Sequence, residues 1–478
     1  MKRLSGLALL VLLTSIATAQ EKWDLRRCVD YALANNISVK QADIDARRVA
    51  LTLRQSQLSQ YPSVSFSTNG GINSGRSIDP TTNQFTQQQL FFSGFSVNTG
   101  MTLFNWFNIK NTIAGNQYEA EASRASVEKL KNDIALNVAT AYLLVLVSQE
   151  QVNISKVAVQ QTLQNLDNTR KRVEAGALPE LNLAELEAQL ARDSSNLITS
   201  EATVLQNLLN MKAVLNLDAS AAFAIEMPPI DRIPVESLAE LQPESVFALA
   251  IANLPQQKIN DLRIKSATKF LEASRAAMFP TLSLFGGMAS NYANNKIPSV
   301  TSTPTGTFRN TGAKVTVSGI DYNVFSPEFN TVITTYRNKF VTQIGDNFRQ
   351  NIGVSLNVPI FNGGNAKLGY QRNKLTVASL QLTKEQGERT LKQDIYKAYT
   401  DAMTSIQKFN ASKKSVETAE KAYSFAQKRY ELGLLSTIDF LTNQNNLTRA
   451  KTERALAQVD YVFRLKLLEF YKGQGIKL

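Results

Sequence analysis

Hydrophobic residues recur every three or four positions near the start of the chain, across residues 26–60. Polar and charged residues fill the positions between them, so this stretch is expected to form an amphipathic helix. Pro62 lies just past its end, where proline cannot continue a helix. The apolar positions that set the period are Val29, Leu33, Ile37, Ile44, Val49 and Leu53.

Beyond Phe66 the hydrophobic period changes to two, which predicts β-strands. In residues 91–103 one face is mainly apolar and the other is mainly small and polar, and residues 348–360 alternate still more regularly. Residues 62–70 and 280–288 are expected to supply the partner strands. The segments between these strands are rich in Gly, Ser, Thr and Asn and are expected to be loops, including a long one at about residues 285–348 that faces the outside of the cell.

A stretch without Gly or Pro follows the first strand pair, from residue 116 to residue 175. Its apolar residues recur at threes and fours, which predicts a helix from about 105 to 171 that spans on the order of 100 Å. Residues 365–430 repeat the pattern. Helices of this length favour a coiled coil or a helical barrel, because a compact core offers nothing so long to pack against. Each helix ends at a glycine, Gly176 or Gly433, beyond which the chain is expected to turn back as a second helix.

The chain contains two copies of one unit. Residues 32–40 match 250–258, and 61–66 match 279–284 at the same offset. Residues 104–110 match 361–367, and 172–179 match 429–436, at a second offset that is constant for both pairs. Two constant offsets indicate two aligned blocks with one length change between them. We therefore expect a first repeat at 20–217, a proline-rich linker at 218–243 and a second repeat at 244–478.

Two strands per copy give four strands per chain, and four strands are too few to form a barrel. Strands of about ten residues with alternate apolar and polar faces are typical of a transmembrane barrel with a wet interior. Four strands cannot close, and an open sheet edge in lipid leaves backbone groups unsatisfied. Two chains would give eight strands and three would give twelve, so the chain is expected to assemble around a pore. A soluble sandwich with one solvated face is the alternative interpretation of the same strands.

The first twenty residues have the three-part pattern of a secretory signal peptide. Lys2 and Arg3 precede a short apolar run at 7–16, and a small-x-small cleavage site follows at 17–19. We therefore expect residues 1–19 to be removed on export. An N-terminal membrane anchor is the alternative, but the run falls well short of the roughly 20 residues of a spanning helix.

Composition excludes several kinds of chemistry. The 478 residues include no His and a single Cys, Cys28. Without His there is no Ser/His or Cys/His catalytic arrangement, and one cysteine cannot form an internal disulfide. Cys28 is expected to be a packed residue on a helix face, with a reactive thiol as the alternative. We expect no catalytic residues, no metal site and no cofactor.

The formal net charge is +12. A basic chain can bind nucleic acid, but here the basic residues are spread over predicted helix faces and form no dense run with interleaved aromatics. We interpret them as solvated faces with some attraction to anionic lipid head groups. No nucleic-acid partner is expected.

Together the signal peptide, the duplicated unit, the two strands per copy and the very long helices resemble the TolC-like outer-membrane efflux proteins. The resemblance covers nearly the whole chain. It implies a mainly α-helical fold with a transmembrane β-barrel portion. A homotrimer would build a twelve-stranded barrel in the outer membrane that continues as a helical tunnel across the periplasm. It also implies an exit duct that works with a periplasmic adaptor and an inner-membrane pump in efflux or type I secretion, and not an enzyme.

The most specific motif of the resemblance is Arg-x-x-x-Gly, which occurs once per copy where a long helix reverses. Glycine suits this position because it adopts the left-handed conformation of a helix end. In the family the motif marks the periplasmic tip to which the adaptor docks. By resemblance, the two tips are formed by Arg172, Gly176, Ala177 and Leu178, and by Arg429, Gly433, Leu434 and Leu435. The alternative is that the glycines only make turns.

The resemblance also implies a periplasmic aperture. Asp439 matches one position at which the family narrows its tunnel with a ring of carboxylates, whereas the second such position is Thr442. Three carboxylates around an axis would favour cations. Tyr430 matches a residue that locks the closed state, but Asn182 stands where an Asp is usual and Leu435 where an Arg can occur. The closed state is therefore expected to be held differently here, and Asp439 could equally serve only as a helix-start residue.

Two other functions remain open at this stage. An exported structural or adhesive coiled-coil protein would account for the helices, although not for paired strands at fixed offsets from the helix tips. A secreted hydrolase would need a pair of carboxylates, and no Asp/Glu cluster lies in a Gly-rich or strand-end setting that suggests one.

Overall fold

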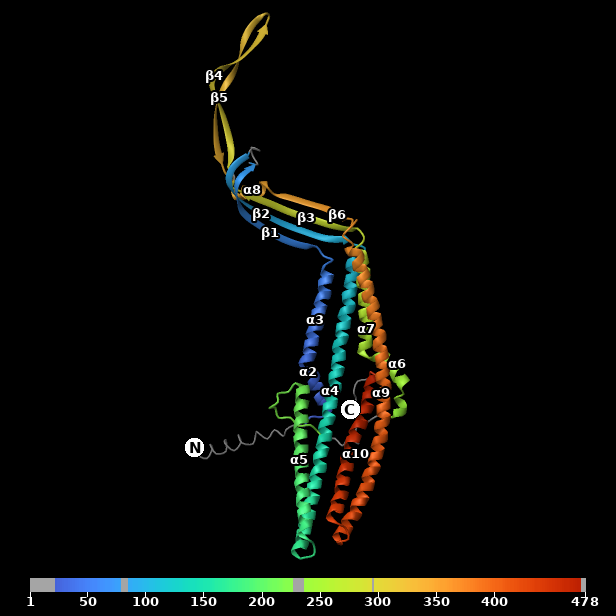
Figure 1. The fold of residues 1–478 in the computed structure, drawn as a ribbon. Helices are drawn as coiled ribbons and strands as arrows, with labels where there is room; N and C mark the ends of the chain where they lie inside the picture. Colours follow the sequence, from blue (N-terminus) through green and yellow to red (C-terminus); the bar gives the residue numbers. More distant parts are fainter. Residues whose placement is uncertain (1–21, 79–84, 227–235, 295, 474–478) are drawn as a thin grey trace, which may run out of the picture. The chain divides into compact units, whose positions relative to one another are not determined.

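The computed structural model describes residues 22–78, 85–226, 236–294 and 296–473. The expected signal peptide, and Pro228, Pro229 and Pro234 of the expected linker, lie outside this part of the chain. Two compact units are present, and each draws on both halves of the sequence (Figure 1). The helical unit comprises Met1–Arg54, Thr112–Leu271 and Gln371–Leu478, and the sheet unit comprises Gln55–Asn111 and Glu272–Tyr370.

Long helices make up most of the described chain. The first half of the chain contributes α2 (Leu25–Asn35), α3 (Ile37–Leu58), α4 (Asn108–Glu174) and α5 (Glu180–Leu215). The second half contributes α6 (Pro243–Asn253), α7 (Pro255–Ala276), α9 (Asn365–Glu431) and α10 (Thr437–Tyr471). At 67 residues each, α4 and α9 are about 100 Å long, as the sequence predicts.

The single helix expected at 26–60 is in fact two helices, α2 and α3. Asn36 between them is extended, with φ −61° and ψ 128°. Its side-chain Oδ1 accepts the backbone N–H of Ser38 at 2.8 Å, and its Nδ2 donates to the carbonyl of Val214 at 3.3 Å. The matching break between α6 and α7 falls at Leu254, which precedes Pro255 and is therefore kept out of the helical region.

Three apolar clusters hold the helical unit together. One surrounds the fully buried Val138, Tyr142 and Leu215, where α4 packs against α2 and α5. A second joins α6 to α9 and α10 around Leu241 and Ile395, and the third lies near the helix tips. One stretch of α4 is long and apolar enough to be considered for a membrane span. Its buried side chains belong to the first cluster, which accounts for their hydrophobicity.

Four antiparallel strands form the main sheet of the sheet unit, in the order β1-β2-β3-β6. They are β1 (Ser63–Ile78), β2 (Phe85–Phe104), β3 (Thr281–Ala293) and β6 (Arg349–Asn357). These are the four strands that the sequence predicts, and strands from the two repeats pair directly where β2 meets β3. The sheet remains open, with β1 and β6 as its edges (Figure 1).

The loop expected at about 285–348 is instead largely regular structure. It contains a second, two-stranded sheet formed by β4 (Ile297–Val317) and β5 (Ile320–Tyr336), followed by the short helix α8 (Phe340–Asp346). Serine, threonine and asparagine are frequent in these strands and interrupt the apolar residues, so no clear period-two pattern marks the strands in the sequence. The β4–β5 hairpin extends away from the end of β3 (Figure 1).

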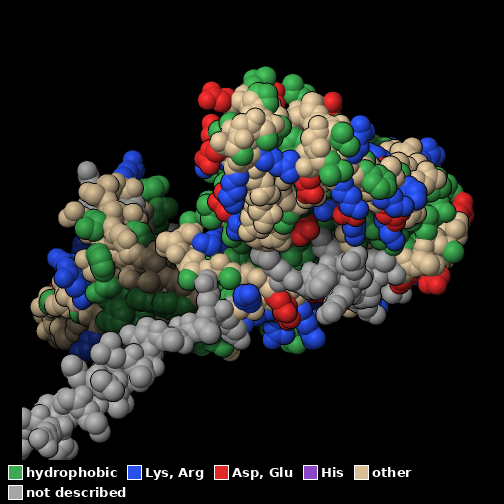
Figure 2. Space-filling view, turned by 90° about the horizontal axis from the view of Figure 1, so that it is seen from below, with side chains coloured by type: hydrophobic (Ala, Val, Ile, Leu, Met, Phe, Trp, Pro, Cys, Tyr) green, Lys and Arg blue, Asp and Glu red, His purple; other side chains and the backbone are tan. Residues whose placement is uncertain are grey.

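The described ends of the expected linker, on either side of residues 227–235, contact the helical unit. Ile225 bridges Trp23 in parallel, and a 3-10 turn, η2, covers Leu238–Glu240. Glu236 accepts an ion pair from Lys472 at 2.6 Å, and its backbone N–H donates to Glu469 at 2.9 Å. On the face seen in Figure 2, Lys and Arg are interspersed with Asp and Glu and do not gather into one patch.

Candidate functional site

Both helix reversals have the same geometry. Gly176 and Gly433 each have φ of 73°, in the left-handed region. At the first tip the N–H of Ala177 donates to the carbonyl of Arg172 at 2.8 Å, and at the second the N–H of Leu434 donates to the carbonyl of Arg429 at 2.8 Å. This six-to-one bond after a left-handed glycine is the Schellman motif. The two Arg-x-x-x-Gly motifs therefore make two equivalent turns.

The tip arginines differ in what their side chains contact. Arg429 Nη2 donates to the carbonyl of Leu434 within its own turn at 3.4 Å. Arg172 Nη1 instead donates to the carbonyl of Tyr430 at 3.4 Å, and so joins the α4–α5 hairpin to the α9–α10 hairpin. Each cation also lies at a helix C-terminus, where it opposes the negative end of the helix dipole.

The apolar residues of the tips are unequally exposed. Leu434 is 64% exposed, and Ala177 is exposed as well. Leu178 and Leu435 are half-buried, and Leu435 packs against the apolar cluster below the tips. The tips thus offer a small apolar surface that includes Leu434 and its still more exposed neighbour Leu432.

Tyr430 lies where the two hairpins meet. Its ring stacks on Phe440 at a centroid distance of 4.6 Å, and its hydroxyl lies 3.0 Å from Thr169 Oγ1 on α4 and 3.4 Å from Thr437 Oγ1 on α10. In the described part of the chain, Tyr430 and Asn182 share no hydrogen bond. Asn182 is half-buried in the first turn of α5, where its N–H donates to the carbonyl of Pro179 at 3.1 Å.

Ser436 is the N-cap residue of α10, and Asp439 lies in the first turn of that helix. The Asp439 N–H donates to Ser436 Oγ at 3.1 Å, and the Ser436 hydroxyl donates to Asp439 Oδ2 at 2.7 Å. The first of these bonds satisfies a backbone donor at the start of α10. Asp439 is therefore a helix-start residue in this chain, and its carboxylate is exposed. Whether it also lines a pore depends on other copies of the chain.

A buried polar seam above the tips is absent from the sequence predictions. Asp193 on α5 accepts from Thr162 Oγ1 on α4 at 2.7 Å and from Gln189 Nε2 at 2.8 Å. Gln444 Nε2 on α10 donates to Thr162 at 2.6 Å, and Gln189 donates to Asn445 Oδ1 at 3.0 Å. These side chains connect α4, α5 and α10. The sequence does contain a sign of this seam. Gln189 and Asp193 follow Leu186 at intervals of three and four residues, which are the positions of a helix that face the core.

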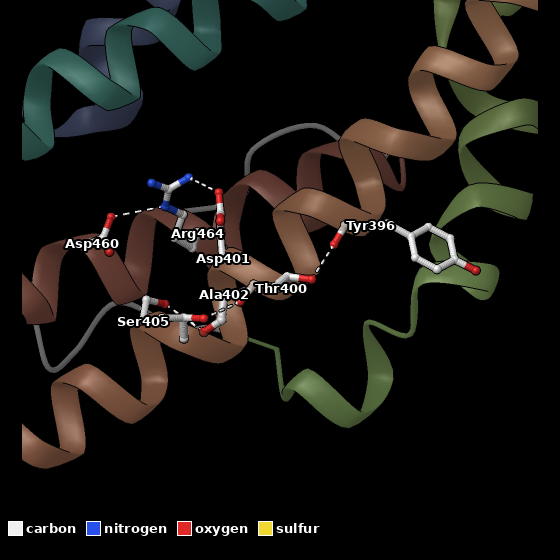
Figure 3. A network of polar contacts seen from close by, with 8 residues as sticks. Tyr396, Thr400, Asp401, Ala402, Ser405, Asp460 and Arg464 are labelled. Carbon is white, nitrogen blue, oxygen red and sulfur yellow. Dashed lines mark hydrogen bonds and ion pairs between the residues drawn. The ribbon is translucent and has the colours of Figure 1, made fainter.

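A second polar network fastens the middle of α9 to α10 (Figure 3). Arg464 Nη1 donates to Asp401 Oδ2 at 2.8 Å, and its Nε donates to Asp460 Oδ1 at 3.2 Å. The Tyr396 ring points away from this network, and its hydroxyl donates to Glu244 of α6. One planar guanidinium thus holds carboxylates of two helices.

The four-stranded sheet has two chemically different faces. In the register, Val97 lies opposite both Phe66 and Met288, and Leu284 lies opposite Val354. The other face carries mainly Ser, Asn and Gly, with Phe92 and Phe285 among them. There the hydroxyls of Ser67 and Ser96 lie 2.7 Å apart. This arrangement extends the period-two pattern of the sequence across all four strands. Members of the apolar face are Val64, Phe66, Ile72, Phe91, Phe95, Val97, Met101, Leu284, Met288, Ile352, Val354 and Leu356.

An aromatic cluster lies where β2 passes into α4. Trp106 and Phe107 both have left-handed backbones, with φ of 53° and 64°. Trp106 packs on Phe279 at a centroid distance of 4.8 Å, and Lys110 Nζ lies 5.8 Å from the Phe107 ring. A left-handed conformation costs a residue with a side chain roughly 1–2 kcal/mol.

The matching positions of the second repeat are Gly363 and Gly364, with φ of 66° and 80°. The same left-handed turn is therefore formed by two glycines, which adopt it freely, at 363 and 364, and by two large aromatic residues at 106 and 107. The structure tolerates the strain of Trp106 and Phe107 because their rings join the aromatic cluster.

Cys28 is fully buried between α2 and its neighbours, as the sequence predicts. Burial raises the pKa of its thiol to about 12, and the Asp24 carboxylate nearby acts in the same direction. The reactive thiolate is therefore scarce near neutral pH, which argues against the alternative of a reactive cysteine.

Known proteins resemble this chain along most of its length. Residues 28–217 and 247–473 match the family described as outer membrane efflux protein. The toxin and drug export protein A of Aggregatibacter actinomycetemcomitans is 24% identical over 282 residues, which cover 58% of each chain. The outer membrane protein TolC of Escherichia coli is 23% identical, over 69% of this chain and 59% of its own. The matched part thus spans less than two thirds of either relative.

A solved structure agrees with this assignment. The crystal structure of CusC, a transmembrane channel, superposes with a TM-score of 0.76 over 95% of this chain and 93% of its own, at 14% identity. At that identity the likeness concerns the fold alone. The match over both repeats, however, covers most of the sequence. The chain therefore belongs to the outer membrane efflux protein family, and it resides in the outer membrane with its helical part in the periplasm.

Proposed function

We propose that this protein is the outer-membrane exit duct of a tripartite efflux or type I secretion system. The observation that carries the proposal is the four-stranded sheet, which has an apolar face, a small polar face and two free edges. An apolar face suits lipid, and a polar face suits a water-filled lumen. Free edges in lipid must be paired.

A homotrimer satisfies these edges. Pairing β1 of one copy with β6 of the next would close twelve strands around a pore, with the closed cyclic symmetry typical of homo-oligomers. Eight strands from two copies would also close, but family membership favours three. The aromatic cluster around Trp106 and Phe107 would then lie at the helical end of the barrel, where aromatic girdles mark the membrane interface.

The helix tips would meet the periplasmic adaptor, which joins the duct to an inner-membrane pump. Support for this comes from the two equivalent turns and from the exposed Leu434 and Ala177 between them. The residues of the periplasmic aperture would lie beside the tips. Asp439 would face the pore axis, Tyr430 would help to lock the closed state, and Asn182 would lie nearby in the first turn of α5. We also propose that 20–217 and 244–478 are copies of one unit separated by 218–243. Substrates would pass without catalysis or a cofactor.

Photo-crosslinking in the native cell tests this function. A photoreactive amino acid replaces Leu434 at a tip or, as control, Leu456, which is similarly exposed on α10 but far along the helix. The expected result is a cross-link from position 434 alone to a protein that mass spectrometry identifies as a periplasmic adaptor. No adaptor cross-link from position 434 would instead favour the exported structural or adhesive coiled-coil protein.

Oligomeric state and conductance provide the second test. Purified full-length protein in detergent should have the native mass of a trimer and should open water-filled pores in planar bilayers. A monomer that stays in solution without detergent would contradict the proposal.

A further inference from the structure

The β4–β5 hairpin is far longer than its position requires. β4 has 21 residues and β5 has 17, so the ribbon is about 55–70 Å long. A membrane strand needs only about 9–11 residues. Between them β4 and β5 form no extensive contact with any other described helix or strand. Two strands alone are marginally stable in water, so a ribbon of this length calls for a covering layer.

The root of the hairpin is held firmly. Gln343 of α8 donates its Nε2 to the carbonyl of Ala293 at 2.9 Å, and its Oε1 accepts the Ala293 N–H at 3.0 Å. Ser290 Oγ donates to the carbonyl of Ile344 at 2.7 Å. These bonds fix α8 against the end of β3, so the hairpin leaves the sheet from a defined place.

Apolar side chains predominate on one face of the ribbon at a time, although Val332 and Tyr336 lie on the opposite face of the shaft. Along the shaft the register puts Val300 opposite Ile333 and Phe308 opposite Pro327, on the face that also carries Phe325. At the tip the apolar residues are on the other face, where Val315 lies opposite Tyr322 and Val317 opposite Ile320. The reverse side of the tip is polar: Lys314 pairs with Asp321 at 4.0 Å. Each of these apolar side chains, Pro327 and Val332 apart, is more than half exposed.

The edges of the ribbon are protected against further strand pairing. Pro298, Pro304 and Pro327 offer no N–H donor, and the register shifts twice, between Pro304 and Phe308 and between Asn310 and Lys314. Prolines and bulges are devices by which proteins blunt sheet edges. Because the edges cannot pair with further strands, another molecule can bind the hairpin only through its apolar faces.

The net charge of the hairpin distinguishes between the molecules that could bind its apolar faces. Residues 297–336 carry two cations, Arg309 and Lys314, and two anions, Asp321 and Glu328. Such a neutral ribbon has no net attraction for anionic lipid or for a strongly charged protein, whereas identical neutral ribbons do not repel one another. In a closed ring, every copy presents its hairpin from the same rim beside its β3.

We infer that the β4–β5 hairpins of neighbouring copies pack against one another through their apolar faces, forming a collar beyond the barrel. This inference rests on the proposed function, because it needs a closed ring of copies. The collar would be held by faces and not by edge-to-edge hydrogen bonds. The exchange of apolar faces between shaft and tip suits a strongly twisted ribbon that turns as it rises.

Cysteine cross-linking of the full-length protein in native membranes tests the collar. In a Cys28→Ala background, Tyr322→Cys and Phe325→Cys place a thiol on the apolar face of the tip and of the shaft. Asn323→Cys and Ser326→Cys are matched controls on the opposite faces. Short bis-maleimide reagents should link Tyr322→Cys and Phe325→Cys between copies at least fivefold more than their controls.

The native mass of the same samples separates the two proposals. An oligomer whose Tyr322→Cys and Phe325→Cys thiols react freely with a water-soluble maleimide and do not cross-link overturns the collar alone. So does an oligomer in which these thiols are protected without cross-linking, because another molecule then covers them. A monomer overturns the proposed function and the collar with it.

Discussion

The Tyr430 hydroxyl on α9 lies 3.0 Å from the Thr169 hydroxyl on α4, so one buried hydrogen bond links the two helical hairpins close to their tips. A second link of the same kind runs from Arg172 to the carbonyl of Tyr430. Asn182 takes no part in either among the described hydrogen bonds. Tyr430 therefore takes part in both of these links, which add to the polar seam and the apolar cluster that also join the hairpins.

Replacing Tyr430 by phenylalanine should loosen this contact while the stacking on Phe440 is kept. The change removes the hydrogen bonds of the Tyr430 hydroxyl to Thr169 and Thr437, each of which contributes about 1 kcal/mol. If closure depends on them, the fraction of time that single channels spend open in planar bilayers should rise about fivefold. Tyr461→Phe, which removes a hydroxyl far along α10, is the control. Equal open fractions in both variants would remove Tyr430 from the closure mechanism.

The polar seam makes a separate prediction about stability. Asp193→Leu should destabilise the helical unit by about 2–3 kcal/mol, because Thr162 and Gln189 lose their shared buried acceptor. Asp193→Asn keeps one oxygen in place and should cost less. Thermal unfolding followed by circular dichroism measures both changes. If Asp193→Leu proves the more stable variant, the seam does not contribute to stability and a packed apolar contact serves as well.

The strands of the main sheet could be predicted because their signal is local. Alternation in residues 91–103 depends only on the side on which each successive side chain points, and the register repeats it across Val97, Phe66 and Met288. The tips could be predicted because Gly176 and Gly433 recur at matching places and adopt the same φ.

Features that depend on distant partners could not be predicted. Gln189 and Asn445 form a hydrogen bond although they are far apart in sequence. Because neither residue indicates its partner, the sequence shows only a helix whose apolar stripe is interrupted by polar residues. The β4–β5 hairpin lies in a segment that is expected to be a loop because it is rich in Gly, Ser, Thr and Asn. Its apolar residues also change faces between Phe325 and Tyr322, which hides the period of two. The strained pair at 106 and 107 becomes visible only when its backbone is compared with that of the second repeat.

Asp439 requires an experiment that separates helix capping from pore chemistry. Ser436→Ala removes the capping hydroxyl and should cost about 1 kcal/mol of stability without changing ion selectivity. Asp439→Asn, which keeps an acceptor at that place, should reduce the preference of the pore for K⁺ over Cl⁻ if the carboxylates ring the axis. Reversal potentials in a salt gradient give the selectivity. An unchanged reversal potential for Asp439→Asn would leave capping as its only role.

The turn at Trp106 and Phe107 is expected to cost backbone strain and to help the protein insert into the membrane. Phe107→Asn should relieve part of the left-handed strain, since asparagine tolerates that region, and should leave unfolding of the detergent-solubilised protein unchanged or slightly harder. Insertion into lipid vesicles should nevertheless fall severalfold, because an interfacial ring is lost. The reciprocal change, Gly364→Phe, adds the strain without the surrounding cluster and should destabilise by about 1–2 kcal/mol. Full vesicle insertion by Phe107→Asn would mean that the ring serves packing alone.

The two faces of the sheet can be distinguished by one charge placed on either side. Val354 and Ser355 are neighbours on β6, and the register puts Val354 on the apolar face and Ser355 on the polar face. An arginine on a lipid-facing site costs about 2–4 kcal/mol near the middle of the bilayer, whereas one facing a wet lumen keeps its water. Val354→Arg should therefore reduce the amount of assembled protein recovered from membranes by at least tenfold, and Ser355→Arg should assemble normally but alter ion selectivity. Because β6 is also an edge strand, Leu284→Arg and Ser283→Arg on the interior strand β3 repeat the comparison away from the edge. If both arginines of a pair are tolerated equally, the strands do not separate lipid from water, and the sheet belongs to a soluble assembly.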